Sequence, residues 1–400
     1  MKIRAITLFA DVGPPLDEAQ VARLGEFVRV ARRAYEDDGF VVQTTRLATR
    51  VSAGTSFSDR PVEFATALEG LCGLHGFEYI SLGPVGRGAW ESLPDLLGAT
   101  ASVFVTISIT HQASGAIDGD AIWAAARVIR QAATVEAEGF ANLRFAALAN
   151  VAPLTPFFPA AYHGGGAPVF AIATESADLA LAACAEADDA EIARRQLTTA
   201  IEDHAGRLTG RAKSLAQAHD VRFGGLDFSL APFPLPETSV GAALERLGGQ
   251  PLGSAGSLAA AAVLTEAIDR ARFPRCGFSG LMLPVLEDTV LAKRVAEGHI
   301  QISDLLQWSA LCGTGLDTVP LPGDASEDAL AALLFDVAAL AVRLKKPLSA
   351  RLMPIPGKAA GDLVHFDFAY FTDSRVLSLG VKGAQCLLTR TTELNLSPRS

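Results

Sequence analysis

Cysteine and histidine, the residues that form disulfide frameworks and zinc sites, are scarce in this sequence. The 400 residues include five cysteines and seven histidines. The cysteines form no C-x-x-C pair and the histidines form no H-x-x-x-H pair. The sequence therefore predicts no zinc site, and the odd, scattered set of cysteines favours reduced thiols in a cytoplasm. A Mg²⁺ or Ca²⁺ site built from distant carboxylates stays open, with these possible ligands: Asp227, Glu287, Asp288, Asp317 and Asp324.

Basic runs and long apolar runs are also missing. The 34 Lys and Arg residues are outnumbered by 44 Asp and Glu residues, and no stretch is rich in Lys and Arg. We therefore expect no nucleic-acid partner. No uninterrupted apolar run reaches the ~18 residues of a membrane span, and the apolar segment at the start is too short for a signal peptide. The sequence thus predicts a cytoplasmic protein without a membrane span.

Alternating strand and helix patterns fill most of the chain, half of which is hydrophobic. Ten segments are rich in β-branched and apolar residues, and most are separated by segments with the three- and four-residue spacing of amphipathic helices. Helical crossovers imply parallel pairing, so we expect an α/β fold with two groups of five parallel strands. The ten predicted strands are residues 2–9, 40–48, 77–83, 102–109, 143–151, 168–174, 222–231, 278–285, 315–323 and 349–356.

A loop rich in proline and glycine, residues 152–167, separates the two groups of strands. Its sequence, "APLTPFFPAAYHGGGA", is too apolar for a solvated linker, so we expect it to be packed. Tyr162 and His163 stand beside three glycines, which let the backbone approach a ligand. If His163 faces the interior, it is our candidate general acid or base, since its ordinary pKa suits proton transfer near neutrality. The alternative is a structural histidine bonded to the backbone.

Candidate ligand-binding residues lie at the ends of predicted strands. "RLMPIPGK" places Arg351 on the tenth strand and Lys358 in the following turn, and both side chains suit a carboxylate or phosphate. The alternatives are a buried ion pair of Arg351 with Asp317 or Glu287, and a solvated Lys358. Asp227, on the seventh strand, is a candidate to orient the catalytic group or bind a metal.

Several other motifs are incomplete. The glycine-rich stretches "GPVGRG" (83–88) and "GGQPLGSAGS" (248–257) do not have the spacing of a dinucleotide loop, and "CGFSGL" (276–281) is not a nucleophile elbow. Cys312, in "LCGTGLDTVPLPGD", is either a reactive thiol or a small buried side chain. It ends a helical pattern, where the helix dipole disfavours a thiolate, so we favour the structural role.

The order of these motifs resembles a known family. "PFFPAAYH", "LDFSLAP", "SAGSLAA", "GFSGLMLPVLED", "LCGTGLDTVPLPGD" and "ARLMPIPGK" follow one another as in uncharacterised protein family 0210, also called DUF711. The resemblance covers most of residues 1–358. "QTTRLATRVSAGTSF" and the region after "FTDSRVL" depart from the family pattern.

The resemblance implies a fold similar to pyruvate formate-lyase and the anaerobic ribonucleotide reductases. That fold is a ten-stranded α/β barrel of two five-stranded parallel half-sheets, antiparallel to each other. For this chain it implies one domain over residues 1–400, with half-barrels at about 1–151 and 168–358 and a C-terminal tail at 359–400. It also implies that the loop at 152–167 lies inside the barrel.

Glycyl radical chemistry is not expected from this sequence. Enzymes of that fold carry a thiyl cysteine on the inner loop, whereas this loop has none. Gly380 and Gly383 near the C-terminus lack the R-V-x-G-[FWY] pattern of a radical glycine. Genes of the family often stand beside one for a small ACT-domain protein, which implies a possible partner.

Two functions remain open at this stage. One is a non-radical enzyme acting on a small anionic metabolite inside the barrel, with Tyr162, His163 and Asp227 as catalytic residues and Glu287, Asp317, Arg351 and Lys358 binding the ligand. The other is a metabolite-binding or regulatory protein without chemistry, partnered by an ACT-domain protein. The high apolar content further predicts a homo-oligomer. No cofactor follows from the sequence.

Overall fold

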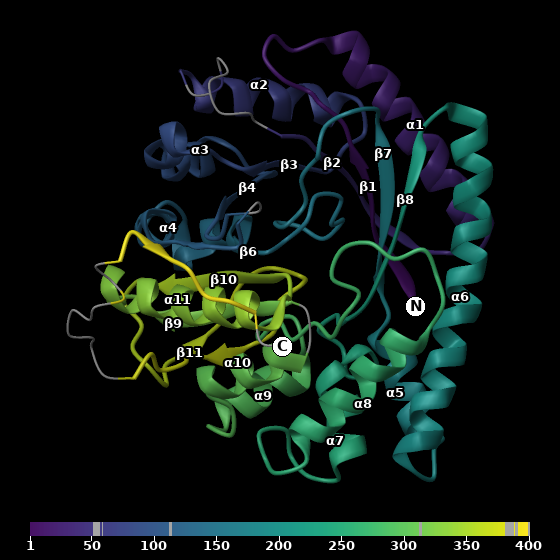
Figure 1. The fold of residues 1–400 in the computed structure, drawn as a ribbon, viewed down its shortest axis with the longest axis vertical. Helices are drawn as coiled ribbons and strands as arrows, with labels where there is room; N and C mark the ends of the chain where they lie inside the picture. Colours follow the sequence, from purple (N-terminus) through teal and green to yellow (C-terminus); the bar gives the residue numbers. More distant parts are fainter. Residues whose placement is uncertain are drawn as a thin grey trace.

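A nine-stranded sheet organises the structure, a computed structural model that describes residues 1–50, 57, 59–111, 114–311, 314–380, 388 and 391–398. Its strand order is β8-β7-β1-β2-β3-β4-β6-β10-β9 (Figure 1). The mixed α/β class predicted from the sequence is therefore confirmed. The strands are β1 (Lys2–Phe9), β2 (Val42–Ala48), β3 (Tyr79–Pro84), β4 (Val103–Ser108), β6 (Phe145–Ala149), β7 (Val169–Glu175), β8 (Arg222–Ala231), β9 (Gly315–Pro322) and β10 (Leu348–Ile355).

Strand direction divides the sheet into two groups. β1, β2, β3, β4 and β6 pair in parallel with one another. β7 and β8 are parallel to each other, as are β9 and β10. The groups meet in antiparallel pairs, β1 with β7 and β6 with β10. The parallel pairing expected within each group is thus confirmed for the pairs that form.

The predicted strand at 278–285 is wrong. Gly277 and Ser279 have left-handed φ values of 63° and 42°, which turn the chain out of an extended conformation. Isolated parallel bridges still join this segment to β8 on one side and to β9 on the other. The predicted ten-stranded barrel thus goes beyond what the structure shows, which is a nine-stranded, mostly parallel sheet.

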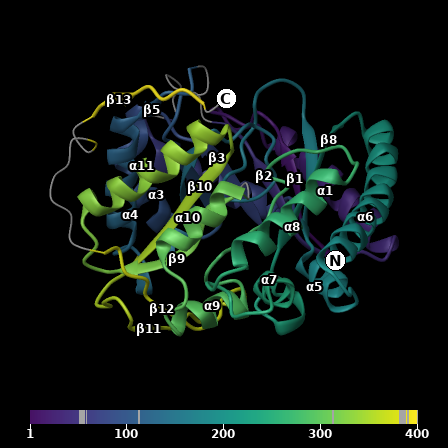
Figure 2. The ribbon, with the colours of Figure 1, turned by 60° about the horizontal axis from the view of Figure 1, so that its bottom comes forward.

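Helices pack against one face of the sheet, around the outside of the molecule (Figures 1 and 2). The short helix α9, which the sequence pattern did not predict, is capped by Asp288, whose carboxylate accepts from the backbone N–H groups of Val290 and Leu291. The α-helices are α1 (Glu18–Asp37), α2 (Pro61–Leu74), α3 (Leu93–Ala99), α4 (Gly119–Ala132), α5 (Ala177–Ala185), α6 (Ala190–His219), α7 (Val240–Gly248), α8 (Ser257–Arg270), α9 (Thr289–Ala296), α10 (Ile302–Leu311) and α11 (Glu327–Leu344).

The two faces of the sheet carry different side chains, because successive residues of a strand point to opposite faces. Large aliphatic side chains such as Ile6 and Leu8 pack under the helices. Small ones such as Ala5 and Ala173 lie on the other, inner face. Every residue from 155 to 163 is buried, and this part of the connecting loop covers the inner face, as expected for a packed loop.

The segment after β10 returns to the inner side of the sheet. β11 (Leu363–Val364) and β12 (Ser374–Arg375) form a hairpin whose connection brings Phe366, Phe368 and Phe371 against one another and against Phe140. The remaining short elements are β5 (Ile117–Asp118), β13 (Glu393–Leu394) and the 3-10 turns η1 (Arg87–Ser92), η2 (Ala137–Arg144) and η3 (Pro236–Thr238).

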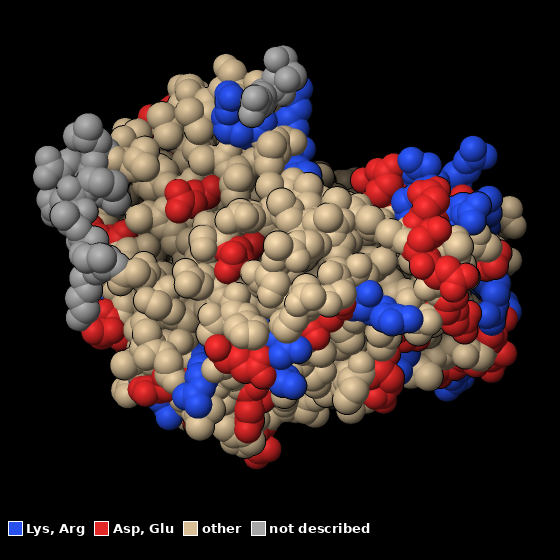
Figure 3. All heavy atoms as spheres, turned by 90° about the horizontal axis from the view of Figure 1, so that it is seen from below, with Lys and Arg blue, Asp and Glu red and all other residues tan. Residues whose placement is uncertain are grey.

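The outer surface carries both signs of charge. On the face shown in Figure 3, acidic and basic side chains are interspersed along the lower edge and the right side, between broad areas without charged side chains. None of the described helices combines the length and apolar character that crossing a membrane requires.

Candidate functional site

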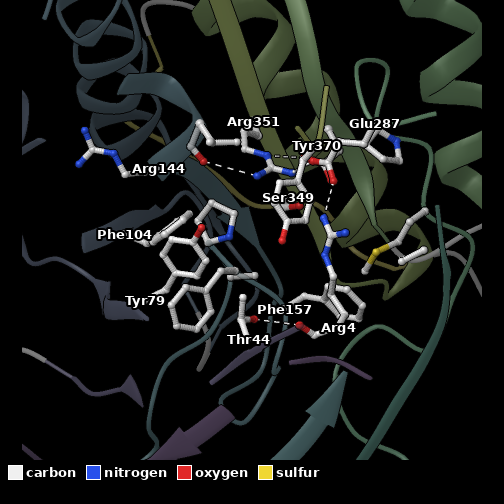
Figure 4. Close-up of a pocket in the computed structure, with 18 of the residues that line it drawn as sticks. Arg4, Thr44, Tyr79, Phe104, Arg144, Phe157, Glu287, Ser349, Arg351 and Tyr370 are labelled. Atoms are coloured by element: carbon white, nitrogen blue, oxygen red, sulfur yellow. Dashed lines mark hydrogen bonds and ion pairs between the residues drawn. The ribbon is translucent and has the colours of Figure 1, made fainter. Parts of the chain in front are cut away.

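An interior cavity of about 280 Å³ lies on the inner side of the sheet. Its lining comes from β1–β4, β9 and β10, from the end of β8, from residues 136–144, from the buried loop, from residues 278–287 and from the segment after β10 (Figure 4). Eight aromatic side chains line it: Tyr79, Phe104, Phe140, Phe157, Phe158, Phe278, Phe368 and Tyr370. A concave, largely apolar site with a few charged groups is typical of small-molecule binding.

An ion-pair network crosses this cavity. Glu287 accepts from two arginines, through Oε2 from Arg4 at 2.7 Å and through Oε1 from Arg351 at 2.9 Å. Figure 4 shows Glu287 between these arginines. Arg351 also donates to Asp317 at 2.6 Å, and Arg4 donates to Glu175 at 3.0 Å. Three residues singled out in the sequence, Arg351, Glu287 and Asp317, are therefore neighbours in the structure, and they form the ion pairs weighed there as an alternative.

The carboxylates keep both arginines of the network charged. Burial of Arg351 disfavours its charge, but Asp317 and Glu287 outweigh the burial and raise its pKa. The pKa of Arg4 is likewise raised, because Glu287 and Glu175 outweigh its burial. The positive charges of these two arginines are therefore compensated within the protein.

Arg46 differs from the other arginines of the cavity. It is only 7% exposed, and its Nε donates to Thr44 Oγ1 at 2.8 Å. Its guanidinium lies over the rings of Tyr79 and Phe158, with centroids at 5.6 and 5.0 Å. Within the described part of the chain no carboxylate forms an ion pair with it. Burial, with a smaller effect of the nearby Arg4, lowers its pKa to about 10, so it is still charged at neutral pH.

Strand geometry explains how these arginines reach the cavity. In β2, alternation places Thr44, Arg46 and Ala48 on the inner face. In β1, Ala5 faces inward, so simple alternation would turn Arg4 outward. The pairing of β1 with β7 is irregular between Ile3 and Ala5, and this irregularity lets Arg4 point inward as well.

The predicted catalytic pair on the loop lies outside the residues that line the cavity. His163 is 1% exposed, and its Nδ1 lies 2.9 Å from a carboxylate oxygen of Asp11. Tyr162 is also buried, and its hydroxyl donates to the backbone carbonyl of Val151 at 2.7 Å. These contacts hold the loop against the ends of neighbouring strands. The acid–base role of His163 stays a prediction.

Asp227 positions a wall of the cavity and is not part of its lining. Its carboxylate accepts from the hydroxyl of Ser229 at 2.6 Å and from the backbone N–H groups of Phe278 and Ser279 at 2.7 and 2.8 Å. These bonds tie the irregular segment that follows Gly277 to β8. Complete burial, only partly offset by these hydrogen bonds, raises the pKa of Asp227 to about 6.

This raised pKa predicts a specific pH dependence of stability. Between pH 3.8 and about 6 the folded protein keeps a proton on Asp227 that the unfolded chain has released. The contribution of Asp227 therefore falls as the pH rises through this range and is constant above it. Relative to Asp227→Asn, which does not titrate, we expect the free energy of unfolding of the wild type to rise by roughly 2 kcal/mol from pH 7 to pH 4. Urea unfolding at both pH values measures this difference, and a difference independent of pH would contradict it.

The other sequence candidates lie apart from the cavity. Lys358 is exposed in the turn after β10 and does not line the cavity. Cys312 falls outside the described residues. Among the described residues, no three His, Cys, Asp or Glu side chains gather as a metal site would require. By contrast, Arg144 lines the cavity, is buried, and pairs with Glu136.

Comparison with known proteins identifies the relatives of this chain. A family model described as "Uncharacterised ACR (DUF711)" matches residues 1–373. The UPF0210 protein of Pyrobaculum arsenaticum is 35% identical, over 90% of this chain and 87% of the relative. The UPF0210 protein of Desulforudis audaxviator is 31% identical, over 87% of this chain and 82% of the relative. That of Methanosarcina acetivorans is 32% identical, over 69% of this chain and 61% of the relative. The resemblance inferred from the motif order is confirmed, and the chain belongs to the DUF711 family.

Proposed function

We propose that this protein binds a small organic anion in its interior cavity. The observation that carries the proposal is Arg46, a buried guanidinium that faces the cavity without a carboxylate partner in the described part of the chain. Burying an unpaired charge costs several kcal/mol in proteins, roughly. An anionic ligand would remove that cost, whereas a neutral ligand would not.

The balance of charges in the cavity supports the same proposal. Four arginines line it, Arg4, Arg46, Arg144 and Arg351, against three carboxylates, Glu136, Glu287 and Asp317. Each arginine other than Arg46 pairs with at least one carboxylate. Glu175, which lies outside the lining, is a further partner of Arg4, so Arg46 is the arginine of the cavity that has no ion pair among the described residues.

We favour a non-radical enzyme over a binding protein without chemistry. Asp317 lines the same cavity, and only its Oδ1 accepts a hydrogen bond from Arg351 among the described residues, so Oδ2 is our candidate base. Tyr79 and Tyr370 also bring phenol groups to the cavity. The loop at 152–167 carries no cysteine, which argues against a thiyl radical there.

We also propose that the fold is the ten-stranded barrel that the family resemblance implies. The bridges of segment 275–285 to β8 and β9, the two edge strands of the sheet, support this arrangement. In such a barrel, segment 275–285 takes the place of the tenth strand, although its backbone is irregular. The cavity would then be the interior of the barrel, and the loop at 152–167 would fill the rest.

Substitution of Arg46 tests the binding proposal. We expect Arg46→Ala to weaken binding of the anion at least about thirtyfold, because removing one partner of a buried charge pair costs about 2–5 kcal/mol. Native mass spectrometry of the purified protein, with a denatured control, would show a ligand mass in the wild type that the variant lacks. Arg33→Ala, at an exposed position of α1, is the matched control and should retain the ligand. Equal ligand occupancy in wild type and Arg46→Ala would refute the proposal.

Recovery of the bound compound separates the enzyme from the binding protein. If the protein is an enzyme, incubation with the identified compound yields a product, and Asp317→Asn lowers turnover at least tenfold while the compound still binds. If the compound is always recovered unaltered, the binding or regulatory protein is the correct interpretation. His163→Ala tests the predicted acid–base role, which fails if affinity and turnover are both unchanged. The homo-oligomer, the ACT-domain partner and the cytoplasmic location stay predictions.

A further inference from the structure

The contacts of Arg46 leave one edge of its guanidinium free for a ligand. Nε is occupied by the hydroxyl of Thr44 at 2.8 Å. The rings of Tyr79 and Phe158 lie against the guanidinium. The remaining donors are the N–H groups of Nη1 and Nη2, for which the described residues supply no carboxylate. A pair of donors on one edge of a planar group matches the two oxygens of one carboxylate.

The neighbouring charges limit the charge of the ligand. Glu287 and Asp317 line the cavity and belong to the network of Arg4 and Arg351, whose charges they compensate. Arg144 is compensated by Glu136. A ligand with one negative charge therefore balances the cavity, whereas a second negative charge would face these carboxylates without a cation of its own.

The walls and the size of the cavity limit the rest of the ligand. Apart from its charged groups, the lining includes eight aromatic rings, among them Phe104, Phe157 and Phe158, and the side chain of Met282. The volume of about 280 Å³ is at the small end of ligand pockets, which span roughly 300–1,000 Å³. That space suits a body of about one ring or one branched chain, and apolar walls favour an apolar body.

We propose that the ligand is a small monocarboxylate with an apolar body, held by its carboxylate on the Nη edge of Arg46. This inference rests on the proposed function and narrows it from organic anions in general to one class. It assigns the charged end of the ligand to β2 and the apolar end to the aromatic wall. It also explains why a guanidinium, and not an ammonium group, stands at this position.

Calorimetric titration with simple probes tests the proposal. The probes are benzoate and 4-methylpentanoate as monocarboxylates, benzamide as the neutral analogue, succinate as a dianion, and inorganic phosphate and phenyl phosphate. We expect both monocarboxylates to bind, and benzamide, succinate and the phosphates to bind at least tenfold more weakly. Arg46→Gln should weaken benzoate at least a hundredfold, and Arg46→Lys, which keeps the charge and loses the planar edge, at least tenfold.

The outcomes distinguish this inference from the proposed function. Tighter binding of succinate, inorganic phosphate or phenyl phosphate, lost in Arg46→Gln, would overturn the monocarboxylate class and leave an anion site. Equal binding of benzoate and benzamide, or benzoate binding unchanged in both Arg46 variants, would overturn the role of Arg46 and the proposed function with it. If no probe binds, the proposal of a monocarboxylate ligand is overturned. Native mass spectrometry would then still test whether the cavity binds an organic anion. If Arg46→Gln fails to fold, as circular dichroism would show, Arg46→Lys alone decides.

Discussion

Replacing Glu287 by alanine is expected to lower the free energy of unfolding by about 3–5 kcal/mol, since two arginines each lose a hydrogen bond to a charged partner, and such a bond contributes roughly 1.5–3 kcal/mol. Glu287 is 6% exposed and contacts two arginines, Arg4 at 2.7 Å and Arg351 at 2.9 Å. Arg4 would keep Glu175, and Arg351 would keep Asp317. The loss is therefore that of one shared carboxylate and not of the whole network. Urea unfolding of the wild type and variant measures it.

Two further variants test whether the loss of stability depends on the burial of the ion pair or follows from the loss of any ion pair. Arg270→Ala removes an exposed pair with Glu266 on α8, and we expect it to cost within about 0.5 kcal/mol. Glu287→Gln keeps the size of the side chain, but its amide N–H₂ must face one of the two arginines, so it should also destabilise the protein. If Glu287→Ala lowers the free energy of unfolding by less than about 1 kcal/mol, water reaches the ion pairs and solvates the charges that the substitution leaves behind.

This network joins parts of the chain that lie far apart in sequence. Arg4 lies on β1 in the first group of strands, whereas Glu175, Asp317 and Arg351 lie on β7, β9 and β10 in the second. Glu287 lies just before α9 and contacts both of the arginines. The ion pairs thus join both groups of strands around the cavity, and Arg46 stays outside the network.

Most strands could be predicted because they are buried on both faces of the sheet, so they appear in the sequence as continuous apolar runs. β1 and β8 begin and end at the predicted residues. The segment at 278–285 was misjudged, since its apolar composition is that of a strand while its left-handed residues prevent one. α9 was missed because a helix of eight residues gives too little periodicity to recognise.

The candidate site was only partly predictable. Arg351, Glu287 and Asp317 stood out as charges within apolar segments, and the structure brings them together. Arg46 could have been found from the alternation of Thr44, Arg46 and Ala48, which places a charge among inward residues. Arg4 could not, because an irregularity in strand pairing sets its direction.

Tyr370 and Phe368 were not predictable as part of the site from local pattern either. They follow the last strand of the sheet, in a stretch with no regular alternation, and only tertiary structure brings them to the cavity. His163 shows the converse problem. Its glycine-rich surroundings suggested access to a ligand, yet the structure buries it beside Asp11 and away from the cavity lining.

The irregular segment that lines the cavity depends on one carboxylate, so replacing Asp227 by alanine is expected to cost roughly 3–6 kcal/mol of stability. The change removes the acceptor of the backbone N–H groups of Phe278 and Ser279 and of the hydroxyl of Ser229, all in or near the buried interior. An unsatisfied buried donor costs about 1–3 kcal/mol, and water has little access here because Asp227 is fully buried. Asp227→Asn should cost less, since one amide oxygen still accepts. Since Phe278 and Met282 line the cavity, ligand affinity should fall in Asp227→Ala even where the protein remains folded. An Asp227→Ala protein with wild-type stability and affinity would show that β8 and the packing around it hold the segment without this carboxylate.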